Sequence, residues 1–228
     1  MLKGKPAGAY TEIVREIARA LDMDLVIRKC PLARCLIFMK EGTADIMMGL
    51  RKSKERESFM NYLTTPYREG GRTVFYISNK KSFDIEKYED LSKLSIGVKK
   101  GAVNFSKFDK DTELNKNFVT TNEQNFKMLV LGRVDTVVAS ETLGDGVVYD
   151  LGYQQEVRKA KFSPNKKVFA FIPISKKSHL VSKTARLEDA MTQMIKNGTL
   201  KKIYLEHYYQ AYNLKFEEEG YVGVAKWP

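Results

Sequence analysis

Hydrophobic residues along the chain alternate between the spacing of a helix and the spacing of a strand. Ile13, Ile17 and Leu21 recur every four residues, which predicts an amphipathic helix over residues 10–22. Short apolar runs with few charges occur further along, and such runs are typical of buried parallel strands. Because the two patterns alternate, we expect an α/β fold.

The pattern predicts two series of elements. In the first we expect strands over 24–30, 44–49 and 72–78, with a helix over 31–41. In the second we expect strands over 94–99, 117–121, 134–139 and 167–172, with helices after Gly101 and over 122–131 and 141–149. Apolar stripes predict two further helices, over 180–194 and 200–212.

The two series resemble each other in layout. Each contains a strand that starts with an Asp followed by apolar residues, at 44–47 and at 134–137. We therefore expect a two-lobe clamshell, in which residues 1–77 plus 169–228 form lobe 1 and residues 78–168 form lobe 2. Strands near 72–78 and 167–172 would be the hinge. A ligand would bind between the lobes, at the carboxyl ends of the strands.

The C-terminal segment looks like the beginning of a domain. Residues 221–226, Tyr-Val-Gly-Val-Ala-Lys, have the pattern of a strand, and Trp227-Pro228 that of the turn after it. The N-terminal segment enters its first helix with no strand before it, although an α/β domain normally begins with one. We expect residues 221–226 to be this first strand, by circular permutation or by exchange between molecules. The start of a second tandem domain and a frayed end remain as alternatives.

Composition excludes several classes of function. The 39 basic and 28 acidic residues give a net charge of +11, but the basic residues are scattered and no nucleic-acid-binding motif is present. No stretch reaches the roughly 20 apolar residues of a membrane span. Two histidines and two cysteines make a weak case for a metal site, and no cofactor is expected. Cys30 and Cys35 could form a disulfide or pack as two buried thiols.

Several short motifs, taken in order, resemble one known family. They are Gly8-Ala-Tyr-Thr-Glu-Ile, Gly42-Thr-Ala-Asp-Ile-Met, Ser53-Lys-Glu-Arg56, Thr65-Pro-Tyr67, Gly97-Val-Lys-Lys-Gly101, Leu131-Gly-Arg-Val-Asp135 and Asn197-Gly-Thr-Leu-Lys-Lys-Ile-Tyr204. Together they resemble the bacterial extracellular solute-binding protein family 3, the polar amino-acid-binding type with a type II periplasmic-binding fold. Each motif alone is weak evidence for the family, but the motifs occur in the family's order and together span nearly the whole chain. The family's first strand resembles residues 222–228, which stand at the opposite end here.

The resemblance implies a set of ligand-binding residues in the first lobe. Arg56 matches the arginine that binds the ligand carboxylate, a role that suits a bidentate guanidinium. Arg51 stands where the family has Ser or Thr, and it adds a second positive charge to the pocket or turns to solvent. The other candidates are Gly49 and Leu50 for backbone groups, Trp227 for stacking, Leu32 and Arg34 from the second helix, and Tyr10 and Tyr67 from the matched motifs. Arg34 could instead pair with Asp45 or Glu41.

The second lobe departs from the family pattern. Ala102 and Val103 stand where a Thr is usual, and Ser140 aligns with the Asp that binds the ligand's ammonium group. Glu141, next in the chain, could take that role at a different angle. Arginines without a certain acid opposite them favour a ligand with more negative than positive charge, such as an organic acid or an acidic amino-acid derivative.

We therefore expect an extracytoplasmic, periplasmic solute-binding protein that serves an ABC-type transporter and its membrane permease. The alternative is a ligand-sensing ectodomain of a membrane signalling protein. A second alternative is a periplasmic dehydratase-like enzyme, for which Glu141 is the only plausible acid, but we do not expect enzymatic activity. The protein would be a monomer, or a dimer if the C-terminal segment is exchanged.

Overall fold

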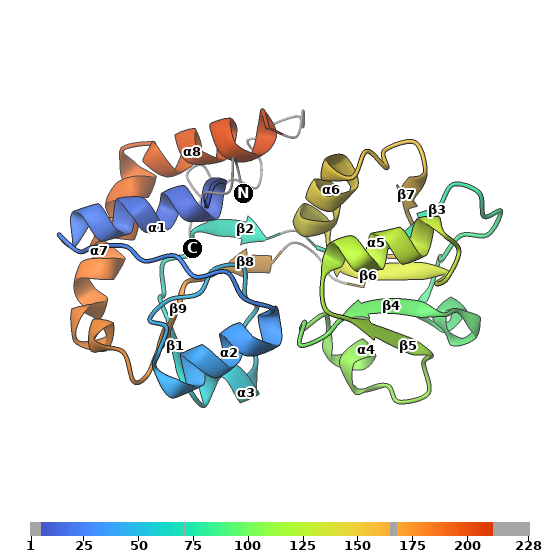
Figure 1. Cartoon of the computed structure of the whole chain (residues 1–228), viewed down its shortest axis with the longest axis horizontal. Coiled ribbons are helices and arrows are strands. Elements are labelled where there is room, and N and C mark those ends of the chain that lie inside the picture. The colour runs from blue at the N-terminus through green and yellow to red at the C-terminus, as the bar shows by residue number, and fades with distance from the viewer. Residues whose placement is uncertain (1–5, 71, 165–167, 212–228) are drawn as a thin grey trace. The chain divides into compact units, whose positions relative to one another are not determined.

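The chain folds into two compact units. The computed structural model describes residues 6–70, 72–164 and 168–211 of the 228 (Figure 1). Unit 1 contains residues 6–30, 34–69 and 169–211, and unit 2 contains residues 31–33 and the described part of 70–168. The strand at 73–78 pairs with its neighbours inside unit 2.

Unit 1 is mostly helical around small antiparallel strand pairs. Its elements are α1 (Ala9–Ala20), α2 (Leu32–Glu41), α3 (Lys54–Glu57), β1 (Met60–Tyr62), β2 (Arg68–Gly70), β8 (Val168–Ala170), β9 (Pro173–Ser175), η2 (His179–Lys183), α7 (Thr184–Lys196), α8 (Thr199–Tyr204) and the π-helical η3 (Leu205–Tyr209). Strand β1 pairs with β9 and β2 with β8. The expected helices at 10–22, 31–41 and 180–194 are confirmed within a few residues.

The core of unit 1 explains why α1 forms. Ile13 and Ile17 are completely or almost completely buried on one face of α1, as their four-residue spacing predicts. They share a hydrophobic cluster with Leu187 and Met191 of α7 and with Leu200 of α8. Figure 1 shows α1, α7 and α8 gathered on one side of this unit.

Unit 2 is a five-stranded sheet covered by helices. Its elements are β3 (Thr73–Ser78), η1 (Tyr88–Lys93), β4 (Ile96–Lys99), α4 (Ser106–Lys110), β5 (Lys116–Val119), α5 (Asn122–Val130), β6 (Thr136–Ser140), α6 (Glu141–Asp150) and β7 (Val157–Lys159). The strand order is β5-β4-β6-β3-β7. Strand β4 is parallel to β5 and β6, whereas β3 is antiparallel to β6 and β7.

Both faces of this sheet are buried. Along β3, Val74 and Tyr76 pack with α5 and α6, whereas Phe75 and Ile77 pack with α4 and η1. Because successive side chains of a strand point to opposite faces, a strand buried on both sides is apolar throughout. The apolar runs therefore predict β3, β4, β5 and β6 within about two residues, whereas β7 (Val157–Lys159) was not predicted.

Two expected strands of unit 1 do not form. Residues 24–30 are not a strand, and within 44–49 only Ile46 forms a bridge, opposite Ile174. Both segments have strand-like side chains, but a strand also needs a neighbour for its backbone groups. Among the described residues, 24–29 have no backbone hydrogen bond at all. The prediction was wrong here because side-chain pattern does not specify the neighbouring strand.

The expected first strand at 221–226, together with Trp227, lies outside the described residues. In the part of the chain that the structure does describe, no helix is both long and apolar enough to cross a membrane.

Candidate functional site

The loop over residues 49–53 in unit 1 wraps around the Arg56 side chain. Ser53 caps α3, since its hydroxyl accepts a hydrogen bond from the Arg56 backbone N–H at 3.3 Å. Arg56 is only 4% exposed, and its Nη1 donates to the Arg51 carbonyl at 2.7 Å. Ser53 therefore holds the backbone of Arg56 and the Arg51 carbonyl holds its guanidinium, so the side chain is fixed within its own loop.

Tyrosines support the start of this loop. Gly49 has a φ of +76°, and its N–H donates to the Tyr67 hydroxyl at 3.1 Å. A Cβ at Gly49 would lie 3.0 Å from Cε2 of Tyr10, whose ring meets that of Tyr67 edge to face. Glycine at position 49 therefore suits both the positive φ of the backbone and the narrow space beside the Tyr10 ring. The Gly49 N–H, expected to face a ligand, is engaged by Tyr67 in this structure, and Leu50 beside it is buried.

A second arginine lies among these tyrosines. Burial raises the pKa of Tyr67 well above its ordinary value, and Tyr10 adds to the rise. Burial works against the charge of Arg68, but the nearby Tyr10 and Tyr204 outweigh it and raise the Arg68 pKa. Its Nε is buried without a hydrogen-bond partner among the described residues. Sequence reasoning missed Arg68, although it directly follows the Thr-Pro-Tyr motif.

Two other basic residues, Lys52 and Arg34, place their charges over aromatic rings. Lys52, also missed from the sequence, places its Nζ 3.8 Å from the centre of the Phe171 ring, within cation–π distance. Arg34 is exposed on α2, with its guanidinium over the Phe38 ring, and Leu32 begins that helix half-buried. Arg34 forms no ion pair with Asp45 or Glu41 among the described residues.

A disulfide joins Cys30 to Cys35 at the start of α2, so the disulfide alternative for these cysteines is confirmed.

In unit 2, the sequence-predicted residues lie at the ends of strands. Ala102 and Val103 are half-buried in the loop after β4. Ser140 ends β6, and Glu141 begins α6. Of these four residues only Glu141 carries charge, so the electrostatics of this region depend on its surroundings.

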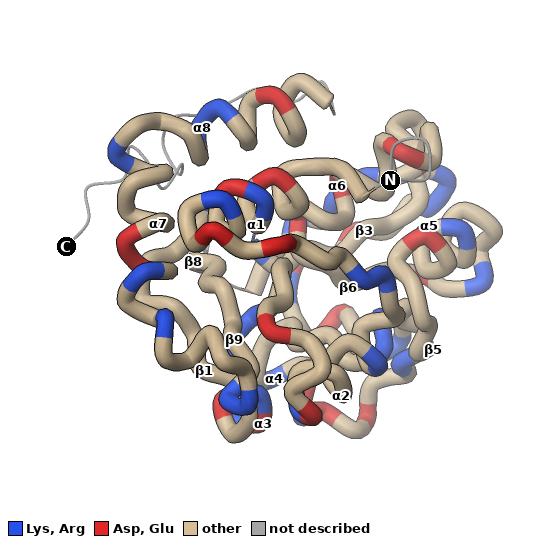
Figure 2. Tube along the Cα trace, turned by 60° about the vertical axis from the view of Figure 1, so that its left-hand side comes forward, with Lys and Arg blue, Asp and Glu red and all other residues tan. Residues whose placement is uncertain are grey.

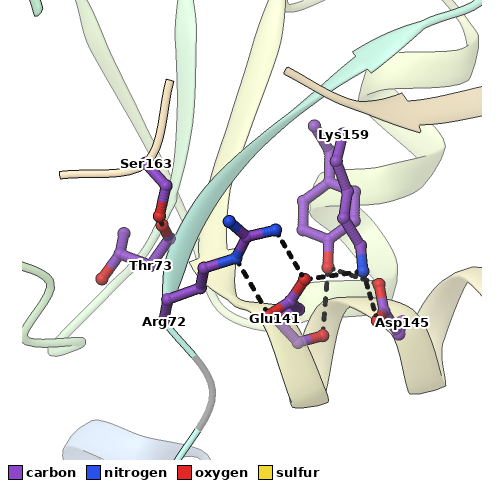
Figure 3. Close-up of polar contacts among 7 residues, drawn as sticks. Arg72, Thr73, Glu141, Asp145, Lys159 and Ser163 are labelled. Carbon is purple, nitrogen blue, oxygen red and sulfur yellow. Dashed lines mark hydrogen bonds and ion pairs between the residues drawn. The ribbon is translucent and has the colours of Figure 1, made fainter. Parts of the chain in front are cut away.

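Glu141 is the centre of an ion-pair network (Figure 3). Arg72 donates to both carboxylate oxygens, at 3.2 and 3.3 Å, and Lys159 donates to one of them at 2.9 Å. Lys159 also reaches Asp145 at 2.7 Å. The Tyr76 hydroxyl bonds the Glu141 carbonyl and the Asp145 carboxylate at 3.0 and 2.8 Å. These contacts use residues from β3, β7 and α6 together with Arg72 just before β3.

The network determines what Glu141 can do chemically. Burial by itself would raise the pKa of Glu141, but the hydrogen bonds from Lys159 and Arg72 outweigh burial and lower it. Burial likewise works against the charge of Lys159, but Asp145 and Glu141 raise its pKa above the ordinary value. Glu141 is thus an ionised carboxylate already balanced by cations. It is poorly suited to bind a further ammonium group, and it lacks the raised pKa of a general acid.

Basic and acidic residues are otherwise interspersed along the elements, as Figure 2 shows for α1. The described part of the chain contains no cluster of three or more His, Cys, Asp or Glu side chains that could hold a metal ion.

Comparison with known proteins gives consistent results. The model of the family "Bacterial extracellular solute-binding proteins, family 3" matches residues 1–210. The probable amino-acid-binding protein YxeM of Bacillus subtilis is 24% identical over 204 residues, which cover 88% of this chain and 75% of YxeM.

Solved structures are similar over most of their length. The amino acid ABC transporter substrate-binding protein AbpA from Streptococcus pneumoniae, bound to L-arginine, aligns with a TM-score of 0.80 and 19% identity, covering 94% of this chain and 90% of AbpA. A histidine kinase sensor domain with similarity to periplasmic binding proteins aligns with a TM-score of 0.79 and 16% identity. The alignment covers 91% of this chain and 88% of the sensor domain. These likenesses show the fold, and they confirm the expected α/β periplasmic-binding type.

Proposed function

Because the chain belongs to the bacterial extracellular solute-binding proteins, family 3, we propose that it captures a small carboxylate-bearing solute outside the cytoplasm for an ABC-type transporter. The family match confirms the resemblance seen in the motifs. YxeM is named as an amino-acid-binding protein, and AbpA is named as the substrate-binding protein of an amino acid ABC transporter. Both names support an amino acid or a related acid as the ligand, and a membrane permease as the partner.

The observation that carries this proposal is the buried Arg56 in its capped loop. A guanidinium presents five N–H donors in a fixed planar fork, which matches the two oxygens of a carboxylate. The same fork can hold the Arg51 carbonyl, as it does here at 2.7 Å, and bind a ligand carboxylate. Burial strengthens such a contact because water competes less for the charges.

The charges around the candidate residues favour an acidic ligand. In unit 1, Arg51, Lys52 and Arg56 lie within six residues of each other. In unit 2, Ser140 replaces the expected acid, and Glu141 is neutralised by Arg72 and Lys159. A ligand with a second carboxylate, or without an ammonium group, therefore fits the candidate residues better than arginine does. AbpA binds L-arginine, but at 19% identity its ligand does not transfer to this chain.

A sensory role is the second candidate, because a histidine kinase sensor domain shares the fold with a TM-score of 0.79. Ligand capture would be the same in either role, and only the membrane partner would differ. Enzymatic activity has less support, since the family consists of solute-binding proteins and the lowered pKa of Glu141 opposes an acid–base role.

A thermal-shift screen tests the proposal. The screen should contain the twenty amino acids and a set of small mono- and dicarboxylic acids, each at millimolar concentration. A ligand present at 100 times its Kd stabilises the folded state by about 2.7 kcal/mol. We expect stabilisation by acidic amino acids or dicarboxylates and none by lysine or arginine. Stabilisation by basic amino acids alone would refute the charge preference, and a flat response across the screen would contradict solute binding.

The transporter and sensor roles are separated by a second assay. The ligand-loaded protein should stimulate ATP hydrolysis by its cognate transporter in proteoliposomes. Stimulation of autophosphorylation by a membrane kinase, with no effect on ATP hydrolysis by the transporter, would favour the sensor role instead.

A further inference from the structure

Arg68, at the start of β2, carries a positive charge that no described residue of unit 1 balances. Its Nε is buried without a hydrogen-bond partner, and none of its nitrogens lies within ion-pair distance of a described carboxylate. We propose that Arg68 determines specificity by binding a second carboxylate of the solute, distinct from the carboxylate that Arg56 binds. This inference rests on the proposed function, to which it adds a residue that selects dicarboxylates and acidic amino acids.

The neighbours of Arg68 are tyrosines. Its charge interacts most strongly with Tyr10 of α1, Tyr204 of α8, the adjacent Tyr67 and Tyr208 of η3. Phenols ordinarily titrate near pH 10, so these side chains are uncharged at pH 7. Figure 1 shows β2 close to α1 and α8, the helices that carry two of these rings. Within the described part of the chain, Arg68 therefore has polar and aromatic neighbours but no counter-charge.

A guanidinium in such surroundings is costly unless an anion joins it. Arginine stays protonated in proteins, so Arg68 cannot avoid the cost by losing its proton. The Tyr204 ring centre lies 5.9 Å from the Arg68 Cζ, at the edge of cation–π range, and such a contact does not replace hydrogen bonds to the N–H groups. Because buried charges in proteins are normally paired or hydrogen-bonded, an anionic group of a ligand is the partner that this site calls for.

The Arg68 side chain is accessible to such a ligand. Its Nε is shielded from solvent, but the residue as a whole is only half-buried, so part of the side chain can be reached from outside. The N–H groups of a guanidinium form a planar fork that matches the two oxygens of a carboxylate. A carboxylate can therefore bind here without displacing any hydrogen bond that Arg68 forms with the described residues.

Tyr10 and Tyr67 connect Arg68 to the loop around Arg56. The Tyr67 hydroxyl accepts the Gly49 N–H at 3.1 Å, and the Tyr10 and Tyr67 rings meet edge to face with 5.7 Å between their centres. Gly49 begins the loop that wraps around Arg56. A solute that lies along the tyrosine pair can present one carboxylate to each arginine, whereas a basic solute would meet a second cation.

Unfolding of the ligand-free protein distinguishes a binding arginine from a structural one. Arg68→Met keeps the approximate length of the side chain and removes its charge. Removing a partly buried charge that has no counter-charge relieves its desolvation cost, so the variant should unfold in urea at the wild-type midpoint or at a higher one. A clearly lower midpoint would show that Arg68 has a stabilising partner in the folded chain, and would overturn the premise of an unbalanced charge.

Isothermal titration with matched acids and amides tests the assignment itself. In each pair one carboxylate is replaced by an amide: L-aspartate and L-asparagine, L-glutamate and L-glutamine, succinate and succinamate, glutarate and glutaramate. Wild-type protein should bind at least one acid roughly 30-fold more tightly than its amide, because loss of a charged partner from a buried pair costs at least this factor. Arg68→Met should reduce this preference to within about threefold, mainly by weakening the acid.

Three results of the titration would overturn the role of Arg68. The first is a wild-type protein that binds each acid and its amide equally. The second is a preference for the acid that persists unchanged in Arg68→Met. The third is an equal loss of affinity for acid and amide in Arg68→Met, because Arg68 would then not bind the carboxylate in which they differ.

Arg56→Ala separates this inference from the proposed function. It removes the partner of the carboxylate that acid and amide share, so it should weaken both equally and leave their ratio at the wild-type value. A ratio that depends on Arg68 while Arg56→Ala changes neither affinity would refute the role of Arg56 alone. Binding of monocarboxylates from the thermal-shift screen, with no preference for any acid of the four pairs, would refute the role of Arg68 and leave carboxylate capture in place.

Discussion

Neutralising Glu141 should reduce the stability of the protein by an amount that disappears in acid. The substitution Glu141→Gln keeps the size of the side chain and removes its charge. It weakens the contacts from Arg72 and Lys159 and leaves the backbone bonds of Glu141 in place. The side chain of Glu141 is 22% exposed, whereas those of Arg72 and Lys159 are 46% and 35% exposed.

The magnitude follows from this exposure. Solvent-exposed ion pairs contribute about 0.2–1 kcal/mol each, because water and salt screen the charges. With two such pairs on a carboxylate that is itself mostly buried, the loss should be about 1–2 kcal/mol at pH 7. For a chain of this size, that corresponds to a fall in Tm of roughly 2–8 °C.

The pH dependence has a definite sign. The pKa of Glu141 is lower in the folded protein than the value of about 4.3 in an unfolded chain. Its contribution is therefore complete above pH 4.3 and is lost as the pH falls through the lower, folded-state pKa. Urea unfolding of both proteins between pH 3 and pH 7 measures the difference in unfolding free energy.

Glu206→Gln is the control, because Glu206 is 47% exposed and its contacts to Lys202 and His207 are long, at 3.9 Å. It should change stability by less than about 0.5 kcal/mol at every pH. If the cost of Glu141→Gln were unchanged at pH 3, or if the variant were as stable as the wild type at pH 7, the reasoning about the network would be refuted.

Three further changes have expected outcomes. A Cβ added by Gly144→Ala would lie 2.5 Å from Cζ of Tyr76, so the variant should lose about 1–3 kcal/mol in urea unfolding, and unchanged stability would show that the Tyr76 ring is free to move. Ser53→Ala removes the cap of α3 and should cost about 1 kcal/mol of stability while weakening ligand binding through Arg56, so unaltered binding by calorimetry would count against the loop's role. Reduction of the disulfide releases a short loop and should cost about 2 kcal/mol, measured by urea unfolding with and without dithiothreitol, and no change would mean that the bond constrains little.

The sequence predicts four of the five strands of unit 2, β3 to β6, because their pattern and their packing agree, but it misses β7 and the short helix η1. Phe75 and Val74 lie on opposite faces of β3, and both faces are covered, so an apolar run suffices to identify the strand. In unit 1, the three-residue strands β1 and β9 are too short to show a period. The segment 24–30 is a strand that was predicted but is not observed. Its apolar run has the pattern of a strand, but the segment has no neighbouring strand among the described residues.

The site is predictable where its contacts are local. Ser53 and Arg56 lie three residues apart in one motif, so the cap that joins them is a contact between near neighbours in the sequence. The network around Glu141 joins residues 69 and 18 positions apart, so no local pattern reveals that Arg72 and Lys159 neutralise it. Arg68 was missed for a similar reason, since the tyrosines around it come from α1, α8 and η3 as well as from Tyr67 beside it.

The central claim is that Arg56 binds the carboxylate of a small solute. Isothermal titration with the tightest-binding acid from the screen should compare the wild type with Arg56→Ala and Arg186→Ala. Arg186 is an exposed arginine on α7, so its removal changes the net charge equally.

Loss of a buried charge partner typically costs 2–5 kcal/mol, so Arg56→Ala should weaken binding by roughly 30-fold to several thousand-fold. Arg186→Ala should leave the affinity within about twofold of the wild type. A folded Arg56→Ala protein that binds the acid as tightly as the wild type does would contradict the claim.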